Sequence, residues 1–113
     1  MLVRVSLIAA TAFVLSTAAG HAASFNCGLA KTPTEHAICD NPQISTLDEQ
    51  TSGLYYQIIS SGAPANTVSQ VKASQVNFLA QRNSCGAGYD CLISAYTSQI
   101  MYLKNVASNL GLR

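Results

Sequence analysis

The stretch TPTEHAICDNP at residues 32–42 decides the fold of this chain, because it marks where two helices begin. Thr32 is a good helix cap, Pro33 suits the first helical position, and Glu35 can reach back to the backbone of the cap. Pro42 disfavours a helical conformation in the residue before it and can itself open a further helix. The stretch therefore predicts a helix of about two turns that starts at Pro33 and stops just before Pro42, followed at once by a second helix.

Apolar side chains recur at helical spacing along the rest of the chain. In the second helix they share one face, at Ile44, Leu47, Leu54, Tyr55, Ile58 and Ile59. After a turn at residues 60–64, a helix over about residues 66–83 has a face made of Val68, Val71, Gln75, Phe78, Leu79 and Arg82. A fourth helix, for which Asp90 is well placed as N-cap, carries Leu92, Tyr96, Ile100 and Leu103. No useful length of the chain alternates with a period of two, so we predict an all-α fold: a small disulfide-stapled helical bundle with one short and three longer helices.

Residues 1–22 have the three regions of a secretory signal peptide. A short start with Arg4 precedes an apolar run over residues 5–19, and the small residues that follow suit cleavage after Ala22. The apolar run is too short and too polar to span a bilayer, which takes roughly 20 apolar residues. We therefore expect residues 23–113 to form a single domain that is periplasmic or secreted and has no stable membrane insertion after cleavage.

The chain has four cysteines, Cys27, Cys39, Cys85 and Cys91. An even number in a short exported chain implies two disulfides, although four cysteines allow three connectivities and the sequence leaves all of them open. Geometry favours two local bridges, because the glycines between Cys85 and Cys91 permit a tight reversal. Cys27 and Cys39 can likewise meet if the segment before Thr32 folds back along the short helix.

Composition and charge argue against several kinds of function. The chain has six basic and five acidic residues and no basic stripe, so we expect no nucleic-acid partner. His36, which we expect to be exposed, is the one histidine after the signal peptide, and the cysteine spacings match no usual zinc motif, so we expect no metal site and no cofactor. Asp48 and Glu49 are adjacent on a helix and point about 100° apart, which suits stabilisation of the helix start and not shared acid–base chemistry. We identify no catalytic residues and expect that the protein is not an enzyme.

Two runs of residues carry a resemblance to a known family. The first is Phe25-Asn26-Cys27, residues 32–42, Leu47-Asp48 and Tyr55; the second joins Lys72-Ala73-Ser74-Gln75, Phe78-Leu79, Arg82-Asn83, Cys85, Cys91-Leu92 and Tyr96. In order and spacing the chain resembles the LprI-type lysozyme inhibitor domain, a family of small exported helical proteins, over nearly all of residues 23–113. It departs from that family at Phe78, where tryptophan is usual, and at Asn83, where an aspartate usually follows the arginine.

The resemblance implies inhibition of lysozyme, by a rigid protrusion that enters the sugar-binding cleft of the enzyme and meets its two catalytic carboxylates. The protrusion that we expect is the turn at residues 83–90, with Tyr89 as an aromatic anchor and with Arg82 or Lys31 as a cation that approaches a carboxylate. The turn at residues 60–67 is a second candidate. The alternative function is a periplasmic structural, accessory or chaperone-like module whose apolar helical faces bind a different protein, with no activity against lysozyme.

Overall fold

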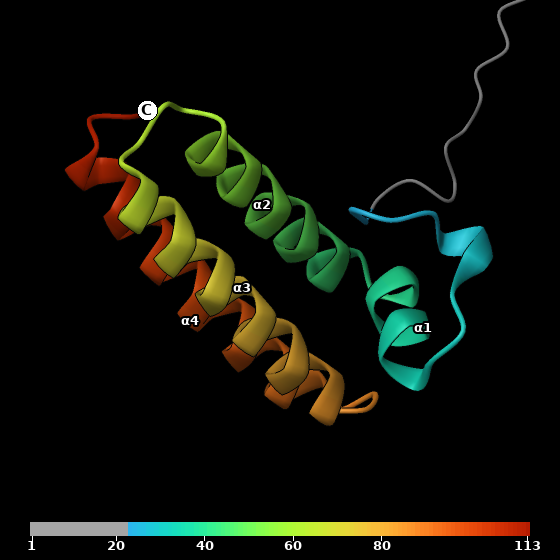
Figure 1. Ribbon diagram of the computed structural model, residues 1–113. Helices are drawn as coiled ribbons and strands as arrows, with labels where there is room; N and C mark the ends of the chain where they lie inside the picture. Colours follow the sequence, from blue (N-terminus) through green and yellow to red (C-terminus); the bar gives the residue numbers. More distant parts are fainter. Residues whose placement is uncertain (1–22) are drawn as a thin grey trace, which may run out of the picture.

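The computed structural model describes residues 23–113, so the predicted signal peptide lies outside the described residues. The described part of the chain contains helices and no strand, which confirms the all-α prediction (Figure 1). A short 3₁₀ helix comes first and four α-helices follow: η1 Cys27–Leu29, α1 Pro33–Asp40, α2 Pro42–Ile59, α3 Ala65–Ser84 and α4 Tyr89–Asn109. The two local disulfides are also confirmed, since Cys27 pairs with Cys39 and Cys85 pairs with Cys91.

The starts of α1 and α2 form as the sequence predicts. The Thr32 hydroxyl accepts a hydrogen bond from the Glu35 backbone N–H at 3.0 Å. The Glu35 carboxylate in return accepts from the backbone N–H of Thr32 at 3.1 Å, which completes a capping box. Asn41 ends α1 and caps α2, because its side-chain oxygen accepts from the backbone N–H groups of Gln43 and Ile44. Each helix boundary in this segment is therefore held by local hydrogen bonds.

The predicted N-cap of α4 is wrong by two residues. Gly88 occupies the cap position, with no side chain to bond the helix, and Asp90 lies in the first turn of α4. The physical reason is the tight turn between the helices, in which the Gly88 N–H donates to the Cys85 carbonyl at 3.0 Å. A Cβ atom at Gly88 would lie 3.2 Å from that carbonyl oxygen, so the close passage favours glycine there. Asp90 still places a negative charge near the positive end of the helix.

α2 and α3 both pack against α4 and contact each other less (Figure 1). α1 packs near the start of α2 and lies at the same end of the bundle as the α3–α4 turn. The C-terminus lies at the opposite end, beside the α2–α3 connection, where the Gln57 side chain donates to the Arg113 carbonyl at 3.0 Å. The three long helices thus form the body of the bundle, and α1 covers one end of it.

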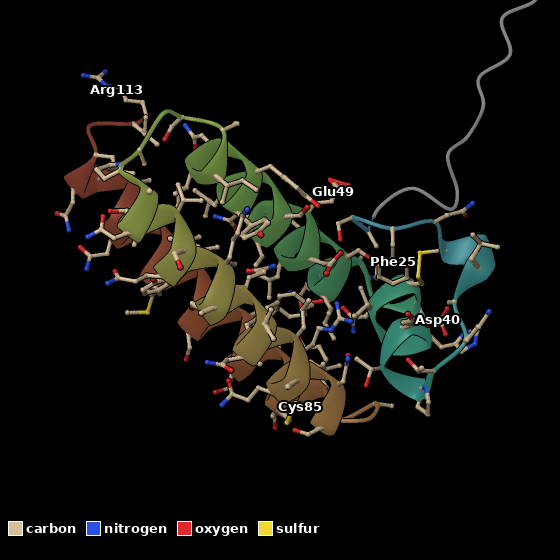
Figure 2. All side chains as sticks on the ribbon, in the orientation of Figure 1. Phe25, Asp40, Glu49, Cys85 and Arg113 are labelled. Atoms are coloured by element: carbon tan, nitrogen blue, oxygen red, sulfur yellow. A yellow bond between two sulfur atoms is a disulfide. The ribbon has the colours of Figure 1, made fainter. Side chains whose placement is uncertain are left out.

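Side chains fill the space between the helices along the bundle (Figure 2). Most of the buried apolar ones belong to one of two clusters. We call the region of the first cluster and both disulfides the disulfide end; its buried members are Ala23, Ile38, Ile44, Phe78, Leu92 and Tyr96. We call the region of the second cluster the far end; its buried members are Ile58, Val71, Leu103 and Ala107. A polar layer separates them, in which the buried Gln99 accepts from Ser74 and donates to Gln75.

Among the described helices, none is long and apolar enough to cross a membrane. Within residues 23–113, no three His, Cys, Asp or Glu side chains gather into a group that could hold a metal ion.

Candidate functional site

The turn closed by the Cys85–Cys91 disulfide is exposed and held from two sides. The disulfide joins the end of α3 to the first turn of α4. From outside the turn, the Thr34 hydroxyl of α1 donates to the Gly86 carbonyl at 2.7 Å, and Thr34 itself is buried. Gly86 has a φ of 59°, a conformation that favours glycine. The residues that follow Gly86, from 87 to 91, are exposed, so this turn presents a rigid surface to solvent.

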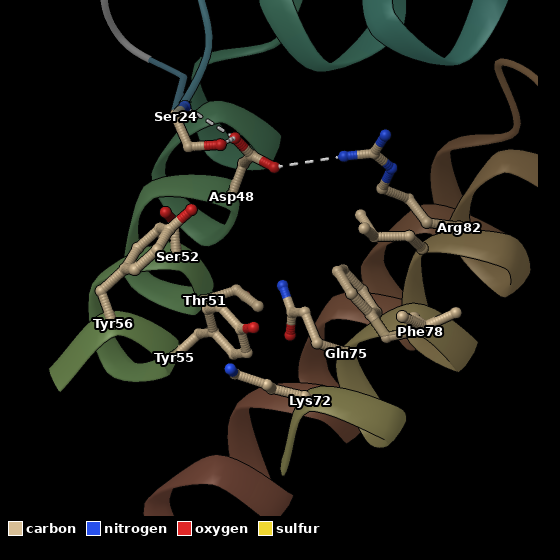
Figure 3. Close-up of a pocket in the computed structure, with 12 residues that line it drawn as sticks. Ser24, Asp48, Thr51, Ser52, Tyr55, Tyr56, Lys72, Gln75, Phe78 and Arg82 are labelled. Carbon is tan, nitrogen blue, oxygen red and sulfur yellow. Dashed lines mark hydrogen bonds and ion pairs between the residues drawn. The ribbon is translucent and has the colours of Figure 1, made fainter. Parts of the chain in front are cut away.

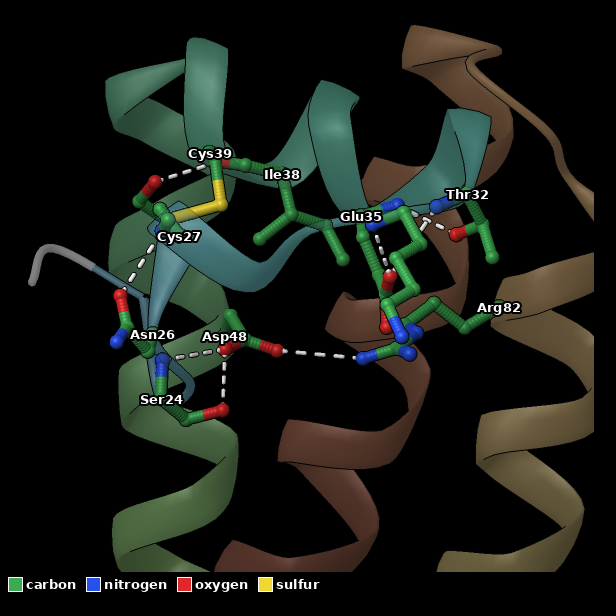
Figure 4. The surroundings of a disulfide bond; sticks show 12 residues. Ser24, Asn26, Cys27, Thr32, Glu35, Ile38, Cys39, Asp48 and Arg82 are labelled. Atoms are coloured by element: carbon green, nitrogen blue, oxygen red, sulfur yellow. Dashed lines mark hydrogen bonds and ion pairs between the residues drawn. A yellow bond between two sulfur atoms is a disulfide. The ribbon is translucent and has the colours of Figure 1, made fainter. Parts of the chain in front are cut away.

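The Cys27–Cys39 disulfide ties the start of the described chain to the end of α1 (Figure 4). Both of its cysteines pack against the disulfide-end core, as does Cys85. The disulfides therefore extend the core as well as crosslinking the chain. In the chain-entropy model the Cys27–Cys39 loop adds on the order of 3 kcal/mol to the stability, and the shorter Cys85–Cys91 loop adds somewhat less.

Asp48 is the centre of a buried polar cluster at this end of the bundle. Its carboxylate accepts from the Tyr96 hydroxyl at 2.6 Å. It also accepts from the Ser24 N–H at 2.7 Å and from the Ser24 hydroxyl (Figure 4). Arg82 completes the cluster with an N–O distance of 3.6 Å. This corrects our interpretation of Asp48 as a residue that stabilises the start of a helix, because Asp48 lies beyond the first turn of α2 and is 4% exposed.

Arg82 faces the interior and is only 9% exposed. One arm of its guanidinium faces Asp48, while the Nε and the other terminal nitrogen donate to the Asn83 side-chain oxygen at 3.1 and 2.9 Å. A buried charge that is paired and hydrogen-bonded in this way is costly to withdraw. The position does not suit the surface contact that we expected of Arg82, and we assign it to the cluster around Asp48.

The other two predicted contact residues are exposed and belong to segments at the disulfide end. Lys31 precedes the cap of α1, and its backbone N–H donates to the Glu35 carboxylate at 2.7 Å. Tyr89 is 43% exposed at the start of α4 and donates its hydroxyl hydrogen bond to the Gln43 side chain of α2. Tyr89 thus lies within the disulfide-closed segment, Lys31 lies in the chain just before α1, and Arg82 is buried at the end of α3.

Two pKa shifts follow from these contacts. Burial, reinforced by the negative charge of Asp48, raises the pKa of the Tyr96 hydroxyl far above its ordinary value. Hydrogen bonds from the backbone N–H groups of Lys31 and Thr32 lower the pKa of the Glu35 carboxyl. Tyr96 therefore remains a neutral hydrogen-bond donor to Asp48, and Glu35 is held in its charged form.

A second feature is a cleft of about 340 Å³ between α2 and α3 (Figure 3). Asp48 and Arg82 lie at one end of the cleft. Its other lining residues include three exposed apolar side chains: Tyr56 at 61%, Val76 at 66% and Leu79 at 36%. This cleft was not predicted from the sequence. Val76 could have indicated it, because this apolar residue lies outside the apolar face that helical spacing predicts for α3.

Comparison of the chain with protein-family models, curated proteins and solved structures found no match. The fold and the two surface features define a disulfide-stapled all-helical domain with an exposed rigid turn at one end and a cleft along one side.

Proposed function

We propose that this protein is an exported, periplasmic or secreted inhibitor of lysozyme, and that its disulfide-closed turn binds the enzyme. The resemblance to the LprI-type domain supports the target. The observation that carries the proposal is the turn itself, which is closed by the Cys85–Cys91 disulfide and fixed from α1 by the Thr34 hydrogen bond.

Rigidity is the physical reason why this turn suits an inhibitor. A preorganised loop loses little conformational entropy when it enters a cleft, so more of its contact energy remains as affinity. Tyr89 offers an exposed aromatic ring within the disulfide-closed segment, and aromatic rings of this kind dominate many interfaces. Lys31 provides the exposed cation at the same end for a carboxylate of the enzyme.

The α2–α3 connection is a less suitable contact surface than the disulfide-closed turn. It lies at the far end, and no disulfide closes it. The rigid crosslink distinguishes the two turns and favours residues 85–91 as the binding surface.

The test is turbidimetric lysis of cell walls by lysozyme with and without the oxidised protein. We expect the protein to slow lysis, and a Cys85→Ser/Cys91→Ser variant to inhibit at least about tenfold less well. Tyr89→Ala should weaken inhibition by about 10- to 100-fold, as loss of an interface anchor does. Met101→Ala, an exposed apolar change further along α4, is the control and should inhibit normally. Absence of slowing at a several-fold molar excess, with both animal-type and goose-type lysozymes, would contradict the proposal.

A second candidate function is an accessory or chaperone-like module that binds a protein other than lysozyme. It is supported by large apolar side chains exposed away from the turn, such as Leu29 at 69% and Met101 at 66%. Suppression of aggregation of reduced insulin at a stoichiometric ratio measures this activity. We expect Leu29→Ser/Met101→Ser to abolish suppression if these side chains carry it, and a protein that suppresses no aggregation contradicts this candidate.

A further inference from the structure

The cleft between α2 and α3 combines apolar walls with polar groups that the fold does not use. Tyr56 of α2 and the pair Val76 and Leu79 of α3 supply exposed apolar surface on opposite sides. The ring of Tyr55 packs edge-on against Tyr56, with 5.1 Å between ring centres. One wall of the cleft is therefore aromatic and the other is aliphatic.

Several hydrogen-bonding groups in this cleft have no partner within residues 23–113. The hydroxyl groups of Ser52, Tyr55 and Tyr56 make no hydrogen bond there, and the Lys72 ammonium forms no ion pair. The Gln75 side-chain oxygen accepts from Gln99, which leaves the Gln75 amide nitrogen as an unused donor. Figure 3 shows Lys72 and Gln75 extending from α3 toward Tyr55 on α2. These groups are available to a ligand in the cleft.

The charges lining the cleft leave one positive charge without a counter-charge. Asp48 and Arg82 neutralise each other at one end. Lys72 then remains as the single unneutralised charge among the lining residues. A ligand that fits this cleft is expected to carry a carboxylate near Lys72.

We propose that this cleft binds an acidic saccharide, that is, pyranose rings that carry a carboxylate. A pyranose ring has an apolar C–H face for the walls and hydroxyl groups around its edge for the unused donors and acceptors. The volume of about 340 Å³ lies at the lower end of the range for small-molecule sites, which suits one or two rings. The apolar face of a partner helix fits less well, because it would bury Lys72 and Gln75 without hydrogen bonds.

This saccharide site does not rest on the inhibition of lysozyme. The two proposals use different surfaces, since the disulfide-closed turn contributes no residue to the cleft. Tyr56→Ala and Tyr89→Ala therefore separate them. The first should affect saccharide binding alone, and the second should affect inhibition alone.

The experiment is a titration of the oxidised, ¹⁵N-labelled protein, followed by backbone amide chemical shifts. The probe is the disaccharide N-acetylglucosaminyl-N-acetylmuramic acid, which carries a carboxylate, and chitobiose is its uncharged counterpart. We expect the acidic disaccharide to bind with a Kd of about 1 mM or lower and to shift amides around Ser52, Tyr56 and Gln75. Chitobiose should bind about fivefold more weakly, as expected for loss of one exposed ion pair.

Two variants distinguish a specific saccharide site in the cleft from nonspecific contact. Lys72→Gln should remove the preference for the acidic disaccharide, so that the two disaccharides bind the variant with similar affinity. Tyr56→Ala should weaken both ligands by at least about fivefold, while Met101→Ala, an exposed control on α4, should bind as the wild type does. No shifts up to about 10 mM ligand, shifts located away from α2 and α3, or equal affinity for the two disaccharides would each overturn the proposal.

Discussion

The two ends of the bundle are stabilised in different ways. The disulfide end has both crosslinks, the larger apolar cluster and the buried Asp48–Arg82 pair. The far end is held by a smaller apolar cluster centred on Ile58, Val71 and Leu103, and it contains no disulfide. The crosslinks are therefore found where the chain is least regular: at η1, at short α1 and at the tight α3–α4 turn.

This difference indicates which parts of the fold are held by apolar packing and which depend on crosslinks. Long helices satisfy their own backbone groups and need only a matching apolar face, which the far end supplies. A helix as short as α1 is marginal by itself and depends on tertiary contacts and crosslinks. The same crosslinks rigidify the surface that we propose for binding. Stability and the proposed function thus depend on the same end of the molecule.

Among the variants that test this difference between the two ends, Asp48→Ala should lose the most stability. The substitution leaves the Arg82 charge buried without a counter-charge and removes the acceptor of the Tyr96 and Ser24 hydrogen bonds. We expect the free energy of unfolding to fall by about 3–5 kcal/mol. Urea denaturation of the oxidised protein, followed by far-UV circular dichroism, measures it.

Glu49→Ala is the matched control for Asp48→Ala, because Glu49 is the exposed neighbour on the same helix. Its effect should stay within about 0.5 kcal/mol. If both variants lose the same amount of stability, the buried cluster does not distinguish the disulfide end, and our description of Asp48 fails.

Removal of the Cys27–Cys39 crosslink should have the next largest effect. We expect Cys27→Ser/Cys39→Ser to lose about 3 kcal/mol, because the unfolded chain regains the entropy of the closed loop. Hydrogen exchange of the variant should lose most of its protection in α1 and much less at Ile58 in the far end. Equal loss at both ends would show that the bundle unfolds as one unit and that the ends are not separately stabilised.

The sequence predicts the local features of this molecule better than the long-range ones. The capping box at Thr32, the second helix start at Pro42 and both disulfides were predictable, because each depends on residues close together in the chain. The Asp48 cluster was not, because Tyr96 lies 48 residues away and Ser24 lies 24 residues away. The signal that could have found it was Arg82, the one charged residue on the mainly apolar face of α3, since a buried charge requires a partner of opposite charge.

A smaller effect is expected from loss of the α1 cap. Thr32→Ala removes the acceptor for the Glu35 backbone N–H and should lower the free energy of unfolding by about 1 kcal/mol. The loss should be larger in the variant without the Cys27–Cys39 disulfide, because α1 is then held by fewer constraints. A double-mutant cycle with urea denaturation measures this coupling, and strictly additive losses would show that the cap and the crosslink act independently.

The smallest effect concerns the pH dependence of the same cap. The pKa of Glu35 is lowered in the folded protein by the N–H groups of Lys31 and Thr32, so its charged form contributes stability above its ordinary pKa of 4.5. This contribution is lost as the pH falls through the lower, folded-state pKa. Glu35→Gln should therefore be less stable than the wild type near about pH 7, and the difference should shrink as the pH falls below about 4.5. Urea denaturation across this range measures it, with Glu49→Gln as control, because the Glu49 carboxylate accepts no hydrogen bond within residues 23–113. A difference between Glu35→Gln and the wild type that does not change with pH would mean that the capping box stabilises α1 by its shape and not by the charge of Glu35.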